Sequence, residues 1–321
     1  MSEPQPENGL LKPYHLITTK IIQMLEGGVV PWRKPWLDMG PPKNLTSGKA
    51  YRGINTFMLS MCGSAAGYAS PYWLTYNQAT ERGGHVKKGE KSTPVVFWKM
   101  LERRPSAKSD DESGDGSEPT PTTVVKAREF PVLKHFYVFN VEQCEGVEYP
   151  KPEIVECPFT PIEACQRIVE QMPRPPTIQH GETRAYYSHA RDLVNMPRPE
   201  LFESSESYFG TLYHELGHAS GAKSRLNRES IVDAAPFGTP TYAKEELIAE
   251  MTATFLCSEA GIEQVTLPNA ASYIHGWLGK LRSDPKLVVL AAAAAQKASD
   301  YILDRQHDAG REEKKMVSGC W

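Results

Sequence analysis

The stretch His214-Glu215-Leu216-Gly217-His218 constrains this chain more than any other. Two histidines four residues apart lie on one face of an α-helix, one turn apart, where both can bind a single metal ion. Glu215 points about 60° around the helix from His218, which suits it to hold a water molecule rather than to ligate. This layout is typical of a zinc hydrolase, in which the metal lowers the pKa of the water and the carboxylate takes its proton.

The residues around this motif predict the helix that it needs. Ser204 or Ser205 can cap the helix, Glu206 stands in its first turn, apolar residues recur at helical spacing, and Gly221 can end it. The five-residue pattern also occurs by chance. The alternative is two hydrogen-bonded histidines on an ordinary amphipathic helix.

A third metal ligand is expected from residues 241–259. Glu246 and Glu250 share one helix face, in a stripe of small residues that would let another helix approach closely. The helix macrodipole favours acids near a helix start, which explains Glu245 and Glu246 without a metal but leaves Glu250 unexplained. We therefore expect Glu250 as the ligand and Glu246 as the second choice. Two imidazoles and one carboxylate leave a fourth position open and suit one Zn²⁺ ion, with Mn²⁺ as the alternative.

The charge of the chain is unevenly distributed. Its 321 residues allow two domains, and the formal net charge is −3. Residues 1–100 carry 12 Lys and Arg against 6 Asp and Glu, so the rest of the chain is acidic. A basic front half and an acidic back half indicate different partners for the two parts.

The cysteines and the apolar runs indicate the cellular setting. The six cysteines are scattered and form no C-x-x-C pair, which predicts free thiols in a reducing compartment. No apolar run approaches the roughly 18 residues that span a bilayer, and the N-terminus has no signal-peptide pattern. The sequence therefore predicts a soluble cytoplasmic protein with no membrane partner.

The basic front half interleaves aromatic rings with cations. Rings that stack on exposed bases, set among cations that follow the phosphates, hold single-stranded nucleic acid without reading its sequence. The alternative is that the rings belong to the core of a small α+β domain and the lysines to an ordinary solvated surface. The residues expected to bind a strand are Trp32, Arg33, Lys34, Trp36, Tyr51, Arg52, Lys87 and Lys88.

The chain as a whole reads as an α+β fold. Strands are expected at 94–99 and 132–139, paired with each other, and at 192–197 as the edge strand beside the metal cleft. Residues 73–82 are expected to be helical. Residues 103–123 lack large apolar side chains and predict a disordered insertion.

Several motifs resemble the plasmid antirestriction proteins of the ArdC type. The resemblance covers roughly residues 14–305, and the motifs occur in the family's order. In the front half they are 31–36 (PWRKPW), 51–55 (YRGIN), 73–75 (WLT), 83–90 (GGHVKKGE) and 138–143 (VFNVEQ). In the back half they are 185–188 (AYYS), 214–218 (HELGH), 224–228 (SRLNR) and 242–250 (YAKEELIAE).

The resemblance implies two domains and a function. A single-stranded-DNA-binding domain would occupy residues 13–150, and a mostly helical zincin-like metallopeptidase domain residues 162–305. Residues 1–12 would be a flexible N-terminus, 151–161 a linker and 306–321 a tail. Such a protein protects incoming plasmid DNA during conjugation from host restriction enzymes. His214, His218 and a downstream glutamate would hold the zinc ion.

The mechanism expected of a peptidase follows from the same residues. Glu215 would take a proton from water and pass it to the leaving amine, and Tyr187, His189 or Tyr242 would stabilise the charge on the substrate oxygen. The target would be a restriction enzyme or a DNA-bound protein. One alternative is a DNA-binding protective protein whose metal site is structural or non-proteolytic, and another is a processing peptidase that does not bind DNA.

Overall fold

The structure, a computed structural model, describes residues 11–27, 41–103, 128–151, 161–233, 239–262 and 270–305. The predicted N-terminal and C-terminal tails, the insertion after residue 103 and the interior of the linker fall mostly outside these ranges. The elements in chain order are α1 (Lys12–Glu26), β1 (Lys43–Asn44), α2 (Ile54–Ala66), β2 (Tyr72–Leu74), α3 (Tyr76–Glu81), β3 (His85–Val86), β4 (Thr93–Arg103), β5 (Arg128–Asn140), η1 (Val141–Gln143), β6 (Cys144–Glu145), α4 (Pro161–Glu170), β7 (Thr177–Gln179), β8 (Tyr186–Ser188), β9 (Leu193–Asn195), η2 (Pro199–Leu201), α5 (Ser205–Ala219), α6 (Glu229–Val232), α7 (Pro240–Ala260), α8 (Ala270–Ser283) and α9 (Leu287–Ile302).

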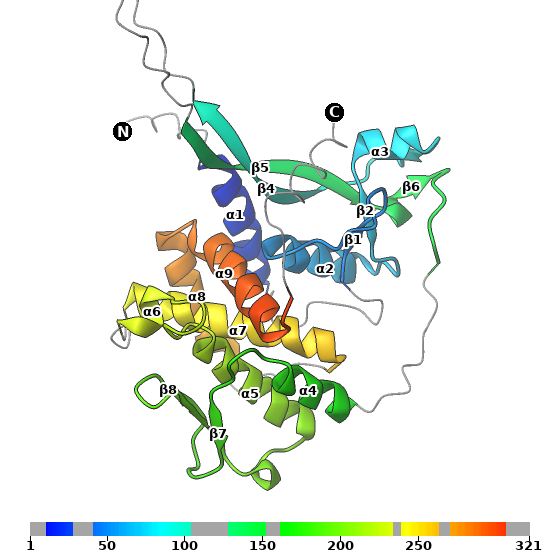
Figure 1. Cartoon of the computed structure of the whole chain (residues 1–321). Helices are drawn as coiled ribbons and strands as arrows, with labels where there is room; N and C mark the ends of the chain where they lie inside the picture. The colour runs from blue at the N-terminus through cyan, green and yellow to red at the C-terminus, as the bar shows by residue number, and fades with distance from the viewer. Residues whose placement is uncertain are drawn as a thin grey trace, which may run out of the picture.

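The N-terminal half contains a four-stranded sheet in the order β1-β2-β5-β4. Strands β4 and β5 pair antiparallel from Thr93 opposite Val138 to Arg103 opposite Arg128, which confirms the predicted pairing of 94–99 with 132–139. Both strands are rich in valine and aromatic residues, which favour a pleated, half-buried surface. Figure 1 shows this long ribbon across the top of the molecule, with α1 and α2 beneath it.

The helix predicted over residues 73–82 is wrong in its first part. Thr75 has extended backbone angles, its hydroxyl accepts a hydrogen bond from the Gln78 amide, and the Gln78 side chain accepts one from the Thr75 amide. This capping box starts the helix at Tyr76. Trp73 lies in β2 instead, opposite Asn140, and is buried.

The C-terminal half combines helices with a three-stranded sheet in the order β7-β9-β8. Strand β9 confirms the predicted strand near 192–197, but its expected position at the edge is wrong. It pairs with β7 on one side and with β8 on the other, so β8 is an edge strand. The pattern of apolar residues does not fix which strands become neighbours, because that depends on the connections between them.

Helix α7 joins the two halves through a shared core. Its Leu247, Met251 and Phe255 belong to the same buried cluster as Phe57 of α2. The rings of Phe57 and Phe255 have centroids 4.9 Å apart. Another face of α7 packs on α5 through residues that include Leu256. The N-terminal domain therefore lies directly against a helix of the C-terminal domain.

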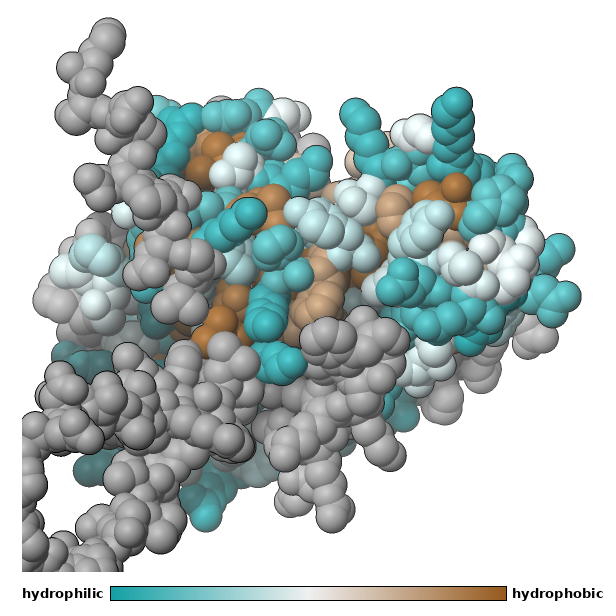
Figure 2. Space-filling model, turned by 90° about the horizontal axis from the view of Figure 1, so that it is seen from above, coloured by the Kyte–Doolittle hydropathy of each residue, from teal (hydrophilic) through white to brown (hydrophobic). Residues whose placement is uncertain are grey.

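The architecture confirms the predicted fold class, an α+β fold with an N-terminal domain of strands and helices and a mostly helical C-terminal domain. Within the part of the chain that the structure describes, no helix is both long and apolar enough to cross a membrane. Seen from above, hydrophilic side chains cover much of the described surface, and hydrophobic ones show between them near its middle (Figure 2).

Candidate metal centre

Helix α5 carries the two histidines. Ser204 caps it by accepting a hydrogen bond from the Ser207 amide at 3.2 Å, and Glu206 stands in the first turn, as the sequence predicted. Its face toward the interior carries Leu212 and Leu216, which are buried. Packing of this apolar face fixes the rotation of the helix and therefore the direction of His214 and His218.

Helix α7 crosses α5 at very short range. A Cβ atom on Gly217 would lie only 3.0 Å from the Cα atom of Ala249 and 3.3 Å from Cβ of Thr252. Small residues on both helices thus let their backbones approach closely, but the closest contact is made by Ala249 and Thr252 rather than by the stripe expected from the sequence. This contact brings the first two turns of α7 alongside the histidines.

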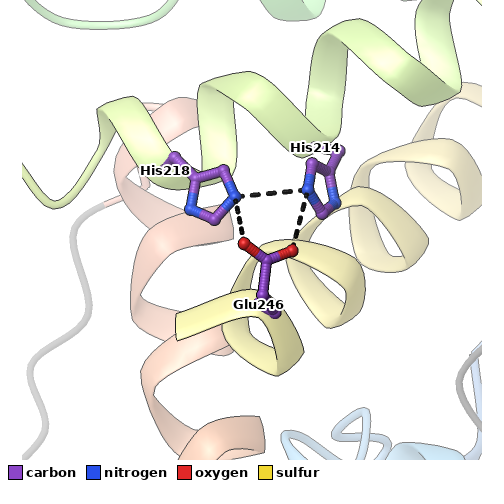
Figure 3. Close-up of side chains that lie close together, drawn as sticks. All are labelled: His214, His218 and Glu246. Atoms are coloured by element: carbon purple, nitrogen blue, oxygen red, sulfur yellow. Dashed lines mark hydrogen bonds and ion pairs between the residues drawn. The ribbon is translucent and has the colours of Figure 1, made fainter. Parts of the chain in front are cut away.

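Three side chains converge between the two helices (Figure 3). The Nε2 atoms of His214 and His218 lie 3.2 Å apart. Glu246 of α7 places one carboxylate oxygen 3.7 Å from Nε2 of His214 and the other 3.6 Å from Nε2 of His218. Among the described residues, these three form the group whose candidate ligand atoms all lie within 4.8 Å of one another.

Glu250, the first choice from the sequence, is not part of this group, and Glu246 takes the place expected for it. The reason is the helix rotation that the contact between Gly217 and Ala249 sets. At 100° per residue, Glu246 lies about 60° from Ala249 around α7, whereas Glu250 lies about 100° from Ala249 and one turn beyond Glu246. The sequence explained Glu246 by its position near the helix start. In the structure its carboxylate also lies beside both histidines.

The three side chains fit a metal ion. A tetrahedral ion bonded at 2.0–2.1 Å holds two ligand atoms about 3.3 Å apart, close to the separation of the two Nε2 atoms. Burial and then the charge on His218 lower the pKa of His214 to about 3. This imidazole is therefore neutral at pH 7, which is the form that ligates.

Glu245 contacts His218 on the side of the ring away from Glu246. A partner for each metal-binding imidazole is a general expectation, but the sequence did not single out Glu245. The residue is 3% exposed, and its carboxylate lies 3.4 Å from Nδ1 of His218. Arg228 donates to both Glu245 oxygens, at 2.5 and 3.1 Å, and the Ser230 hydroxyl donates to one of them. Burial alone would raise the pKa of Glu245, but the hydrogen bonds with His218 and Arg228 lower it to about 2.

Glu215 has the environment of a general base. It is 7% exposed, and burial raises its pKa to about 7, partly offset by the charge on His218 and by the main-chain hydrogen bond from Tyr187. Tyr187 lies in β8, so this edge strand of the small sheet adjoins the helix that carries the two histidines. A base whose pKa is near neutrality both accepts and releases a proton readily.

The structure separates the three candidates for stabilising the substrate oxygen. The Tyr187 hydroxyl donates to Asp192 at 2.9 Å, and Arg225 holds the same carboxylate with two hydrogen bonds of 2.8 Å. His189 is exposed. Tyr242, one turn before Glu246 on α7, is hydrogen-bonded to Glu246, and its pKa is raised to about 12 by burial and by that carboxylate. Tyr242 is thus the candidate nearest to the three convergent side chains.

The structure describes only some of the residues expected to bind DNA. Trp32, Arg33, Lys34 and Trp36 lie outside the described residues. The remaining four are described by the structure: Tyr51, Arg52, Lys87 and Lys88.

Tyr51 is 5% exposed and its ring faces Phe97, so it is a core residue, as the alternative interpretation held. Arg52 forms an ion pair with Asp300 of α9. Lys87 and Lys88 are exposed beside the small β3–β6 sheet, and the Lys87 ammonium donates to the Glu142 carbonyl.

Two family models match the two halves of the chain. Residues 12–139 match the N-terminal domain of anti-restriction factor ArdC. Residues 164–294 match a zincin-like metallopeptidase family. The second match contains both histidines, Glu215 and the first turns of α7.

Individual proteins match over nearly the whole chain. Uncharacterized protein y4eC of Sinorhizobium fredii is 36% identical over 305 residues, which cover 94% of both chains. DNA primase TraC of Escherichia coli is 38% identical over 301 residues, 91% of this chain, but the chain spans only 27% of that protein.

Two solved structures also match over nearly the whole chain. The Mn(II)-bound crystal structure of antirestriction protein ArdC from plasmid R388 is 34% identical, covers 91% of this chain and 97% of its own, and superposes with a TM-score of 0.70. Its metal-free form gives a TM-score of 0.68. With its ArdC-type N-terminal domain, its zincin-like C-terminal domain and these relatives, the chain belongs to the ArdC antirestriction family.

Proposed function

We propose that His214, His218 and Glu246 bind one divalent metal ion and that Glu215 serves it as general base in peptide hydrolysis. The observation that carries this proposal is the convergence of the three ligand atoms beside a buried carboxylate. The donor set of two imidazoles and one carboxylate suits Zn²⁺. Mn²⁺ is the alternative, and the Mn(II)-bound form of the R388 relative supports it.

The residues have separate tasks in this mechanism. A divalent ion in such a site polarises the scissile carbonyl and lowers the pKa of water. Glu215 accepts the proton of the attacking water and delivers it to the leaving amine. The Tyr242 hydroxyl would donate to the negative charge that develops on the carbonyl oxygen, a role supported by its contact with Glu246. Glu245 and Arg228 keep the His218 ring in the ligating orientation.

We also propose that the N-terminal domain binds single-stranded DNA and that the whole protein protects incoming plasmid DNA from host restriction. Membership of the ArdC family, the relation to a DNA primase and the basic front half support this assignment. Trp32, Arg33, Lys34 and Trp36 remain its proposed contacts, with Arg52, Lys87 and Lys88. Tyr51 is not among them, because its ring is buried. A restriction enzyme or another DNA-bound protein would be the target of the metal domain.

Two glutamine variants test the metal site. Glu246→Gln removes a ligand, so the purified protein should lose its bound metal, as measured by elemental analysis after dialysis. Glu250→Gln makes the same change one turn further along α7 and should keep the metal. Loss of metal in Glu250→Gln alone would restore the assignment made from the sequence.

A third variant tests the reaction. Glu215→Gln should keep the metal and the fold but lower the rate of peptide cleavage by roughly 10²–10⁴-fold, the usual contribution of a general base. If this variant still protects DNA from restriction as the unmodified protein does, the metal site is structural or non-proteolytic.

A further inference from the structure

A cavity of about 520 Å³ lies where the two domains meet, apart from the metal centre. Residues 50–55 and strand β4 line one side of it, and helix α9 lines the other. None of its lining residues belongs to the group around His214. Cavities at domain junctions, with volumes of about 300–1,000 Å³, are frequent ligand sites.

The walls of this inter-domain cavity are mainly apolar, and the side chains of one wall are larger than those of the other. On the β4 side stand Phe97 and Trp98, both half-buried and pointing to opposite faces of the strand, with the Trp98 ring 6.3 Å from the Tyr14 ring. The Phe97 ring lies 5.7 Å from the Phe136 ring, at an interplanar angle of 62°. On the α9 side stand Val289 and Ala293, which have small apolar side chains. Apolar walls of this kind, with aromatic residues among them, suit a planar, partly apolar group.

The edge of β4 adds hydrogen-bonding groups to this wall. The Asn55 side-chain amide donates to the Val96 carbonyl at 2.7 Å, and its oxygen accepts from the Val96 amide at 2.8 Å. Alternate residues of a strand direct their N–H and C=O groups to the same edge, so those of Trp98 point the same way as those of Val96. The Asn55 amide binds the N–H and C=O of Val96 with one donor and one acceptor. A nucleobase edge also carries an adjacent donor and acceptor, so it matches the N–H and C=O of Trp98 in the same way.

The rim of the cavity carries more cations than acids. Three cations line it, Arg52, Lys297 and Arg305, against the single acid Asp300. Arg52 and Asp300 form an ion pair that joins the two domains across the cavity, and Arg305 contacts Glu259 at 2.5 Å. Lys297 is exposed at the rim. Because Arg52 and Arg305 are each paired with an acid, Lys297 supplies the positive charge that favours phosphate groups at the entrance.

We infer that this inter-domain cavity takes one base of single-stranded DNA, with the edge of β4 at Phe97 and Trp98 beside the base and Lys297 at the phosphates. The inference rests on the proposed binding of single strands and adds the place where a strand touches both domains. Leu226, which also lines the cavity, follows the metal helix and lies two residues before Arg228. A strand bound there therefore contacts the loop that supports the metal centre.

Binding to the full chain tests this inference. The probe is a fluorescein-labelled deoxythymidine strand of about 12 nucleotides, within the usual range of site sizes, followed by fluorescence anisotropy at fixed salt. Lys297→Glu reverses a charge at the rim, and Ala293→Trp fills the cavity. Each should weaken binding by about tenfold or more. Lys280→Glu is the matched control, because Lys280 is also an exposed helical lysine but does not line the cavity, and it should bind within about twofold of the unmodified chain.

A cross-link locates the strand independently of any substitution. A strand that carries 5-iododeoxyuridine, irradiated on the unmodified protein, should attach to the tryptic peptide of residues 92–99, which contains Phe97 and Trp98. Unchanged binding by both cavity variants, or cross-links confined to residues outside the lining, would refute the cavity while leaving the binding of single strands in place. If the unmodified protein does not bind the strand, the proposed DNA binding fails and the cavity assignment falls with it.

Discussion

The carboxylate of Glu245 lies beside the candidate metal site without belonging to its three convergent side chains. Glu245 is the partner of His218 on the side away from the candidate ligands, and Arg228 and Ser230 fix its carboxylate in turn. Its sequence neighbour Glu246 faces the histidines directly. Two adjacent acids of the first helical turns thus have different roles, which their spacing alone does not reveal.

At the residue scale, we expect Glu245→Gln to lower metal affinity by roughly 10–100-fold, the usual effect of losing such a supporting partner. The change weakens the contact that orients His218 and leaves Arg228 without its charge partner. Competition with a chromophoric chelator measures the affinity. Glu229→Gln removes an exposed acid from the same region and should leave it unchanged. Equal affinities in the two variants would show that Glu245 does not position the ring.

At the element scale, the contact between α5 and α7 decides the site, since one helix supplies the histidines and the other supplies Glu246. Gly217 is the point of closest approach, and it faces main-chain atoms of Ala249 that cannot move away separately. Gly210, in the same helix, has more room, because an added Cβ atom would lie 3.9 Å from the Cys257 sulfur.

These two glycines make a matched pair. Gly217→Ala should destabilise the protein by about 1–3 kcal/mol, as overpacking does, and weaken metal binding because the two helices move apart. Gly210→Ala should instead stabilise it by up to about 1 kcal/mol through helix propensity. Chemical denaturation of both variants measures the free energies of unfolding. If Gly217→Ala stabilised the protein, the two helices would have room for a methyl group at this crossing.

At the scale of the whole molecule, the two domains share one buried cluster. Phe57 of the N-terminal domain is fully buried and packs on Phe255 of α7, the helix that also carries Glu246. A core that continues across a domain junction couples the stabilities of the two parts, whereas a small polar junction lets domains move and unfold separately.

We therefore expect Phe57→Ala to cost about 3–5 kcal/mol and to destabilise both domains together. Unfolding in urea, followed by tryptophan fluorescence and by metal release, should give coincident transitions before and after the substitution. Tyr76→Ala, which truncates a ring that is 58% exposed, should change the stability by less than about 0.5 kcal/mol. Separate transitions for the two signals would contradict the shared core.

The local features of this protein follow from its sequence, because caps and apolar periodicity act over a few residues. Ser204 starts α5, and the β-branched and aromatic runs form β4 and β5 as predicted. Where a local cap competed with periodicity, as at Thr75, the cap set the helix start. The spacing of His214 and His218 likewise fixes that both project from one helix face.

Tertiary structure decided what depends on distant partners. It chose Glu246 over Glu250, because the contact of Gly217 with Ala249 sets the rotation of α7 against α5. It placed β9 between its neighbours and buried the Tyr51 ring against Phe97. Helix rotation, strand order and the burial of a given ring all arise from contacts between segments far apart in the chain, and periodicity along one segment carries no information about them.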